Sequence, residues 1–153
     1  MSKTNKDISK RIRDDHLHMK TAIRDIRKLI KEEVKPESFT PWIKNLQKIL
    51  SYFNTEIHEH FELEEDGGFM DDVLKLKPQK KYAVSQLKTE HELMSTDLRR
   101  IIKCVDEAGT YDEIKKINLT QRIRDFLDLL SVHEAEENLL LEDLYLQDDG
   151  IAD

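Results

Sequence analysis

The chain has 153 residues, 38% of them hydrophobic and 37% charged, and a formal net charge of −7 at pH 7, a balance that argues against nucleic acid as a partner because nucleic-acid binding depends on Lys and Arg neutralising phosphates. One cysteine, Cys104, excludes an intrachain disulfide framework and a Cys-rich zinc or iron–sulfur site. No run approaches the roughly 18 apolar residues of a membrane span, and the first residues lack the apolar stretch of a signal peptide, so we expect a soluble, cytoplasmic protein.

Apolar residues recur at spacings of three and four in four segments, the pattern of helices that bury one face. The first helix is expected over about residues 7–34. The second is expected over about residues 41–66, with Thr40 as its N-cap and Pro41 at its first position. The glycine pair at 67–68 suits the end of this helix.

Residues 69–77 form a longer connection that has room for a short turn of helix before Pro78. The third helix is expected over about residues 79–108 and the fourth over about residues 112–147. Short connections make sequential helices antiparallel neighbours. The sequence therefore predicts one all-α domain over residues 1–153, an up-down-up-down antiparallel four-helix bundle.

Four histidines and two glutamates occupy places on the apolar faces where packing alone would favour Leu or Ile. On two of the helices, His and Glu lie four residues apart, which puts both side chains on one face, one turn above the other. Burying ionised carboxylates without a partner is costly, and metal ions would supply the compensating charge. The predicted metal ligands are His16, His60, Glu64, His91, His133 and Glu137.

A common site in an antiparallel bundle requires ligands at one height along its axis. The four histidines lie roughly 17 to 21 residues from the end formed by the first and third connections, a spread of roughly 6 Å at about 1.5 Å per residue. We therefore expect them to line one cavity. A purely structural polar layer is the alternative interpretation, and His18 and His58, two residues from a ligand candidate, are expected to be solvated or to support a ligand.

Six ligands rich in imidazole, with two carboxylates able to bridge, favour a dinuclear first-row metal centre over a single zinc ion. Iron is the expected metal, while manganese or zinc stays open because affinity alone does not select among them. Ferritin-like bundles use a Glu-x-x-His motif, and none of the six histidines here has Glu three residues before it.

The ordered pattern H, HxxxE, H, HxxxE resembles that of the hemerythrin-like, or HHE cation-binding, family, and the resemblance covers nearly the whole chain. By this resemblance His16 and His60 would bind one iron ion and His91 and His133 the other. The two glutamates would bridge the ions together with an oxo or hydroxo group. The motifs that carry the resemblance are Asp14-Asp15-His16, His60-Phe61-Glu62-Leu63-Glu64, Glu90-His91-Glu92-Leu93 and His133-Glu134-Ala135-Glu136-Glu137.

Two departures separate the chain from the oxygen-carrying hemerythrins, which have a second histidine one turn along the third helix and an HxxxxD motif on the fourth. Here Leu87 and Ser95 flank His91 at four residues either way, and Asn138 stands five residues after His133. One histidine fewer leaves a freer coordination position, which favours reaction with oxygen, peroxide or nitric oxide over reversible oxygen storage.

The four-histidine pattern is also similar to that of bacterial iron–sulfur cluster repair proteins of the hemerythrin-like type, which carry extra carboxylates near the metals. Glu56, four residues before His60, and Glu90, next to His91, stand in matching places. The residues alone leave open whether Glu56 instead hydrogen-bonds to a ligand and whether Glu90 is an ordinary solvated side chain.

The sequence therefore predicts a non-haem di-iron protein that binds or reacts with a small oxidant, namely oxygen, peroxide or nitric oxide, in sensing or in oxidative or nitrosative stress defence. The alternative is a non-catalytic iron-binding, iron-sensing or iron-donor module related to iron–sulfur cluster repair. Whether the protein turns over a substrate, and which protein partner it has, the sequence leaves open.

Overall fold

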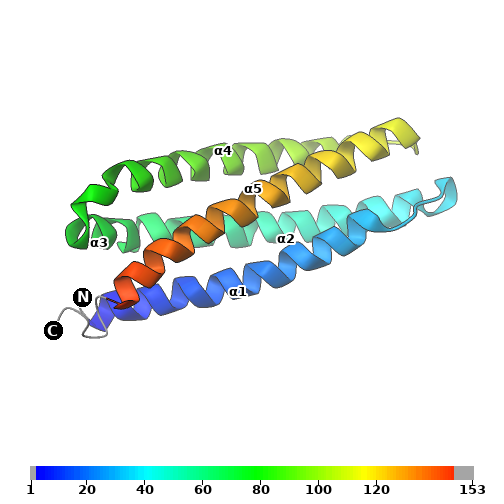
Figure 1. The fold of residues 1–153 in the computed structure, drawn as a ribbon. Helices are drawn as coiled ribbons and strands as arrows, with labels where there is room; N and C mark the ends of the chain where they lie inside the picture. The colour runs from blue at the N-terminus through cyan, green and yellow to red at the C-terminus, as the bar shows by residue number, and fades with distance from the viewer. Residues whose placement is uncertain (1–2, 147–153) are drawn as a thin grey trace.

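The fold is a bundle of long α-helices, and the computed structural model describes residues 3–146 (Figure 1). Two 3₁₀ turns, Pro36–Ser38 and Pro78–Lys80, directly precede the helices that begin at Phe39 and Lys81. No strand occurs within these described residues, and the predicted all-α class is confirmed. The helices are α1 (Lys3–Lys31), α2 (Phe39–Glu65), α3 (Phe69–Leu76), α4 (Lys81–Asp106) and α5 (Glu113–Leu146).

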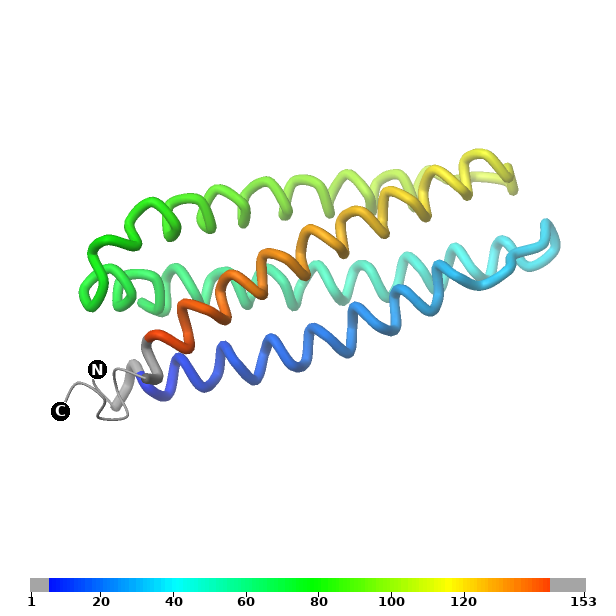
Figure 2. Tube along the Cα trace, in the orientation of Figure 1, coloured from blue at the N-terminus to red at the C-terminus, as the bar shows by residue number. Residues whose placement is uncertain are grey.

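The four long helices run alternately up and down, as the path of the chain in Figure 2 shows. Helix α1 packs against α2 and α5, and α4 packs against the same two helices. Going round the bundle, the order is therefore α1, α2, α4, α5. The predicted antiparallel up-down-up-down bundle is confirmed, and each long helix places one face toward the shared centre.

The first connection differs from its prediction. Helix α1 ends at Lys31, and Ser38 rather than Thr40 stands at the N-cap of α2, so the predicted Thr40 cap is wrong. The 3₁₀ turn Pro36–Ser38 leads directly into the helix. Pro41 is tolerated inside the first turn because the first four N–H groups of a helix have no intrahelical partner. The predicted end of the last helix, Gln147, lies outside the described residues.

Helix α3 is a full eight-residue helix rather than a short turn, and it closes one end of the bundle. Gly68, with φ of +93°, turns the chain between α2 and α3, a conformation that glycine adopts without strain. Phe69, Met70 and Val73 are buried on its inner face. Because α3 contacts all four long helices, it covers the apolar side chains at this end of the bundle.

Two separate apolar clusters form the core. The larger one fills most of the bundle's length and contains buried side chains such as Leu46, Phe53, Leu98 and Leu130. The smaller one lies under α3 and brings together Ile12, Phe69, Met70, Val73, Val84, Leu87, Leu140 and Leu141. The six predicted ligands belong to neither cluster, although all are buried.

Within residues 3–146, no helix combines the length and the apolar character that crossing a membrane requires.

Candidate metal centre

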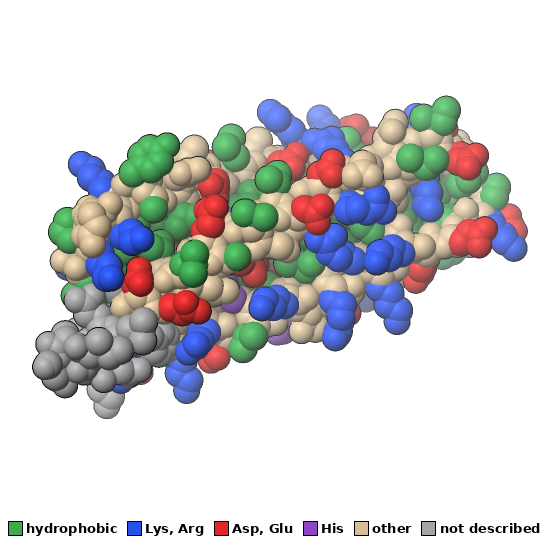
Figure 3. All heavy atoms as spheres, viewed as in Figure 1, with side chains coloured by type: hydrophobic (Ala, Val, Ile, Leu, Met, Phe, Trp, Pro, Cys, Tyr) green, Lys and Arg blue, Asp and Glu red, His purple; other side chains and the backbone are tan. Residues whose placement is uncertain are grey.

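The six predicted ligands come together in one buried layer, to which every long helix contributes. The four histidines are 2% exposed and both glutamates are fully buried. In the space-filling view, other atoms cover almost all histidine surface on the visible face of the bundle (Figure 3). Helix α1 supplies His16, α2 supplies His60 and Glu64, α4 supplies His91, and α5 supplies His133 and Glu137.

The layer divides into two groups of four ligand atoms that share both carboxylates. In each group the ligand atoms lie within 4.8 Å of one another. The two glutamates stand between the two pairs of histidines, so each carboxylate faces both groups. The first group is His16, His60, Glu64 and Glu137, and the second is Glu64, His91, His133 and Glu137.

The distances within the layer are those of a tight polar cluster. The Nε2 atom of His60 lies 3.2 Å from Glu64 Oε1, and the Nε2 atom of His133 lies 3.2 Å from Glu137 Oε1, both across one helical turn. His91 Nε2 is 3.3 Å from a carboxylate oxygen of each glutamate. The layer can therefore present nitrogen and oxygen donors to two neighbouring cations.

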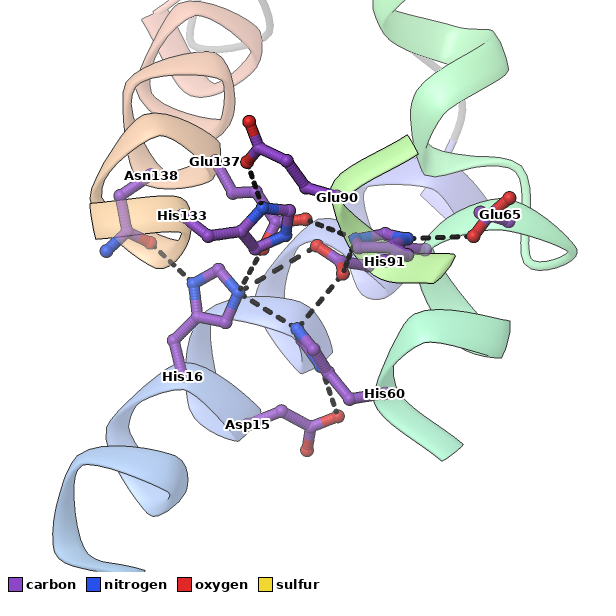
Figure 4. Close-up of polar contacts among 10 residues, drawn as sticks. Asp15, His16, His60, Glu65, Glu90, His91, His133, Glu137 and Asn138 are labelled. Atoms are coloured by element: carbon purple, nitrogen blue, oxygen red, sulfur yellow. Dashed lines mark hydrogen bonds and ion pairs between the residues drawn. The ribbon is translucent and has the colours of Figure 1, made fainter. Parts of the chain in front are cut away.

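Each histidine ring uses its outer nitrogen for a contact outside the layer and turns Nε2 inward (Figure 4). The four contacts of the Nδ1 atoms are His16 with Asn138 at 2.7 Å, His60 with Asp15 at 3.4 Å, His91 with Glu65 at 2.8 Å and His133 with Glu90 at 2.7 Å. When Nδ1–H donates outward, the Nε2 of a neutral imidazole offers its lone pair inward. Carboxylate and amide partners of this kind orient histidine ligands in metal sites.

Several buried atoms of the layer lack a hydrogen-bond partner, and a cation would satisfy them. Both oxygens of Glu64, one oxygen of Glu137 and His133 Nε2 are in this position. The Nε2 atoms of His16 and His60 face one another at 3.0 Å. Two lone pairs at this distance need a shared proton or a cation, so the residues present fit a pair of bound metal ions.

Without metal, the pKa values of the two buried carboxyls are shifted in opposite directions. Burial raises the pKa of Glu64, and the neighbouring Glu137 carboxylate raises it further, well above its ordinary value. Burial acts on Glu137 in the same direction, but contact with Glu64 and with the imidazoles of His133 and His16 brings its pKa well below the ordinary value. Metal binding must therefore displace protons from this layer.

Of the two additional glutamates considered from the sequence, Glu90 contacts a ligand candidate and Glu56 does not do so directly. Glu90 Oε1 accepts from His133 Nδ1 at 2.7 Å, on the neighbouring helix rather than on its own. Glu56 Oε1 lies 3.2 Å from Nε2 of the exposed His18. Glu56 lines a surface pocket that also reaches His60.

Sequence reasoning missed Glu134, a carboxyl that is 3% exposed and adjacent to the layer. One of its oxygens has no hydrogen-bond partner. Burial raises its pKa to about 7, although the charges of His16 and His133 act in the opposite direction. Its place next to His133 in the sequence gave no signal, because a residue one position away usually lies well round the helix.

Within residues 3–146, three surface pockets are each lined by a different ligand histidine. A pocket of about 440 Å³ is lined by His91, one of about 240 Å³ by His60, and one of about 210 Å³ by His16. Ser95, one turn after His91, lines the largest of them. The pockets reach the ligand rings, whereas the carboxylates behind the rings are fully buried.

A layer of four imidazoles and two carboxylates, built from four antiparallel helices, defines a metal-binding helical bundle. The chain matches the model of the Hemerythrin HHE cation binding domain over residues 7–145, which is most of its length, and it belongs to this family. The family predicted from the sequence is thereby confirmed. No curated protein and no solved structure matches the chain significantly.

Proposed function

We propose that this protein holds two iron ions and binds or reacts with a small oxidant (oxygen, peroxide or nitric oxide) in sensing or stress defence. The observation that carries the proposal is the pair of overlapping ligand groups that share two buried carboxylates. In this arrangement His16 and His60 hold one ion and His91 and His133 hold the other. Glu64 and Glu137 bridge the two ions.

The donor set supports a first-row metal ion, of which iron is the one proposed. Imidazole and carboxylate donors suit iron, manganese and zinc, and the family is a cation-binding one. Iron in such a site would supply one-electron and Lewis-acid chemistry. The protein's own contribution is to fix the imidazoles through their Nδ1 contacts and to keep the carboxylates out of water.

The place of the missing histidine supports a small ligand. Leu87, one turn before His91, is buried in the apolar cluster under α3, and Ser95, one turn after it, faces the largest pocket. Neither side chain adds an imidazole to the layer. A ligand of a few atoms fits beside the second group, while a larger substrate is kept from the buried carboxylates.

Metal analysis and ligand mixing test the proposal. Purified protein reconstituted anaerobically with Fe(II) is expected to hold about two iron ions per chain, and stopped-flow mixing with oxygen, peroxide or nitric oxide to change its visible absorption. Less than one bound ion of any metal would contradict the proposal. His60→Ala and Glu64→Ala are expected to lower iron occupancy, with exposed Glu59→Gln as control; unchanged occupancy in both variants would refute the ligand assignment.

A second candidate function, an iron-sensing or iron-donor module, is favoured by the buried charges of the layer. Without a cation, Glu64 and Glu137 are fully buried next to one another and Glu134 lies close by, so occupancy and stability are coupled. Transfer of iron from the loaded protein to a metal-free iron–sulfur protein, without turnover of peroxide or nitric oxide, would favour this function. Turnover without transfer would favour the first.

A further inference from the structure

The residues that accept from the Nδ1 atoms of the four histidines form a closed ring around the bundle. Each acceptor is the immediate sequence neighbour of a ligand on its own helix, and each reaches the histidine of the adjacent helix (Figure 4). In bundle order the Nδ1–H groups donate from α2 to α1, from α4 to α2, from α5 to α4 and from α1 to α5. The acceptors are Asp15, Glu65, Glu90 and Asn138.

The ring is chemically uneven, because three of its members are carboxylates and the fourth, Asn138, is a neutral amide. A carboxylate behind an imidazole makes its inner nitrogen a stronger donor to a metal than an amide does. The first ligand group has the amide behind His16 and a long 3.4 Å contact from Asp15 behind His60. Neither Nδ1 atom of that group therefore has a short contact with a carboxylate.

In the second ligand group, both Nδ1 atoms have a short contact with a carboxylate. Glu65 lies 2.8 Å from His91 Nδ1, and Glu90 lies 2.7 Å from His133 Nδ1. Phe61 also stacks on His91, with ring centroids 3.9 Å apart and an interplanar angle of 12°. The imidazoles of this group are thus both better donors and more firmly oriented.

We infer that the two metal sites are unequal and fill in order, His91 and His133 first, with Asn138 as the positioning residue that keeps the His16 site weak and exchangeable. The inference rests on the proposed two-ion function. The two bridging glutamates serve both sites equally.

Anaerobic titration of the metal-free protein with Fe(II), against a competing chelator, tests the order of filling. We expect two steps whose affinities differ by at least about tenfold, the size of effect that outer partners of histidine ligands have. His16→Ala is expected to keep the tight step and His133→Ala to lose it. Circular dichroism shows whether each variant is folded, and Mössbauer spectra of half-loaded protein are expected to show one iron environment.

Exchanging charged and neutral acceptors tests whether these acceptors cause the difference in affinity between the two sites. Asn138→Asp is expected to tighten the weak step about tenfold and leave the tight step unchanged, because its carboxylate would stand behind His16. The pocket at this position is also lined by two cationic side chains, Arg13 and Lys20, and by one carboxylate, Glu142, so an added negative charge still meets more positive than negative charge. Glu90→Gln is expected to weaken the tight step by a similar factor. Glu136→Gln, an exposed neighbour of Glu137, is the control of equal charge change.

The outcomes separate this inference from the proposed function. Fewer than two bound ions would contradict the two-ion function itself. Two ions bound with equal affinity, or a weak step that Asn138→Asp leaves unchanged, would overturn the inference alone. A first ion that is lost in His16→Ala and kept in His133→Ala would overturn it as well, because the order of filling would be reversed.

Discussion

The buried Glu134 gives the metal-free protein a stability that depends on pH. A carboxyl whose pKa is raised by folding stabilises the protein at low pH, and this contribution is lost as the pH rises through its folded value. For Glu134 the window runs from its ordinary value of 4.5 to about 7. At about 1.4 kcal/mol per pKa unit, the loss is on the order of 3 kcal/mol.

Glu134→Gln is accordingly expected to flatten this loss, since the amide has a similar shape and does not ionise. The free energy of unfolding, measured by urea denaturation with a chelator present at pH 4.5 and pH 8, checks the prediction. Subtracting the variant's pH dependence from that of the unchanged protein isolates Glu134 from Glu64. An identical pH dependence in both proteins would contradict the raised pKa.

The candidate ligands were predictable from the sequence, and three of the four acceptors behind them were not. A histidine or glutamate among apolar residues at helical spacing is visible because it breaks a pattern. Asp15, Glu65 and Asn138 break none, since each looks like a polar residue at the edge of an apolar face. Their contacts with histidines on other helices depend on how neighbouring helices are rotated and staggered, which one sequence does not state.

At the scale of helices, the turn between α2 and α3 depends on two glycines for different reasons. A Cβ at position 67 would lie 2.1 Å from the carbonyl oxygen of Leu63, so the end of α2 would have to shift. Position 68 has open space but a φ of +93°, which costs other residues about 1–2 kcal/mol.

Gly67→Ala is expected to destabilise the protein by roughly 2 kcal/mol or more and Gly68→Ala by about 1 kcal/mol. Gly109→Ala is the matched control, because φ there is +64° and an added Cβ comes no closer than 4.0 Å to Glu107. Urea denaturation gives the three values. A smaller loss for Gly67→Ala than for Gly109→Ala would contradict the close contact.

The existence of the four long helices followed from apolar spacing, and their antiparallel direction followed from the short connections. Helix α3 followed from neither. Its eight residues are too few for a clear apolar period, so the sequence indicated only a short turn between the second and third long helices. Phe69, Met70 and Val73 are nonetheless fully or nearly fully buried. Tertiary contact with all four long helices, rather than local preference, accounts for this helix.

At the scale of the molecule, metal binding is expected to stabilise a bundle that already folds without it, since neither apolar cluster contains a ligand. A ligand present at about 100 times its dissociation constant adds about 2.7 kcal/mol, which corresponds to a rise in Tm of roughly 5–10 °C for a domain of this size. Thermal melts with Fe(II) and with chelator measure this rise in Tm. A His60→Ala/Glu64→Ala protein should show a much smaller rise, and equal rises would argue against these ligands.

The large apolar cluster should carry stability without affecting the metal layer. Leu98 is fully buried in that cluster. The Leu98→Ala substitution is expected to lower the free energy of unfolding by about 2–5 kcal/mol, because apolar burial is lost and a cavity is left. Iron per chain, measured below the melting temperature, is expected to remain unchanged. A fall in iron content matching the fall in stability would show that the two regions are coupled.

The metal layer also restricts how the four helices can align along the bundle axis. Layers of Leu and Ile are largely interchangeable, so an apolar bundle tolerates one helix sliding past its neighbours by a turn, about 5.4 Å. Such a slide would carry His91 away from the glutamate oxygens that now lie 3.3 Å from its Nε2 and leave buried charges unpaired. A single polar layer to which every long helix contributes thus selects one stagger of the helices over its apolar competitors.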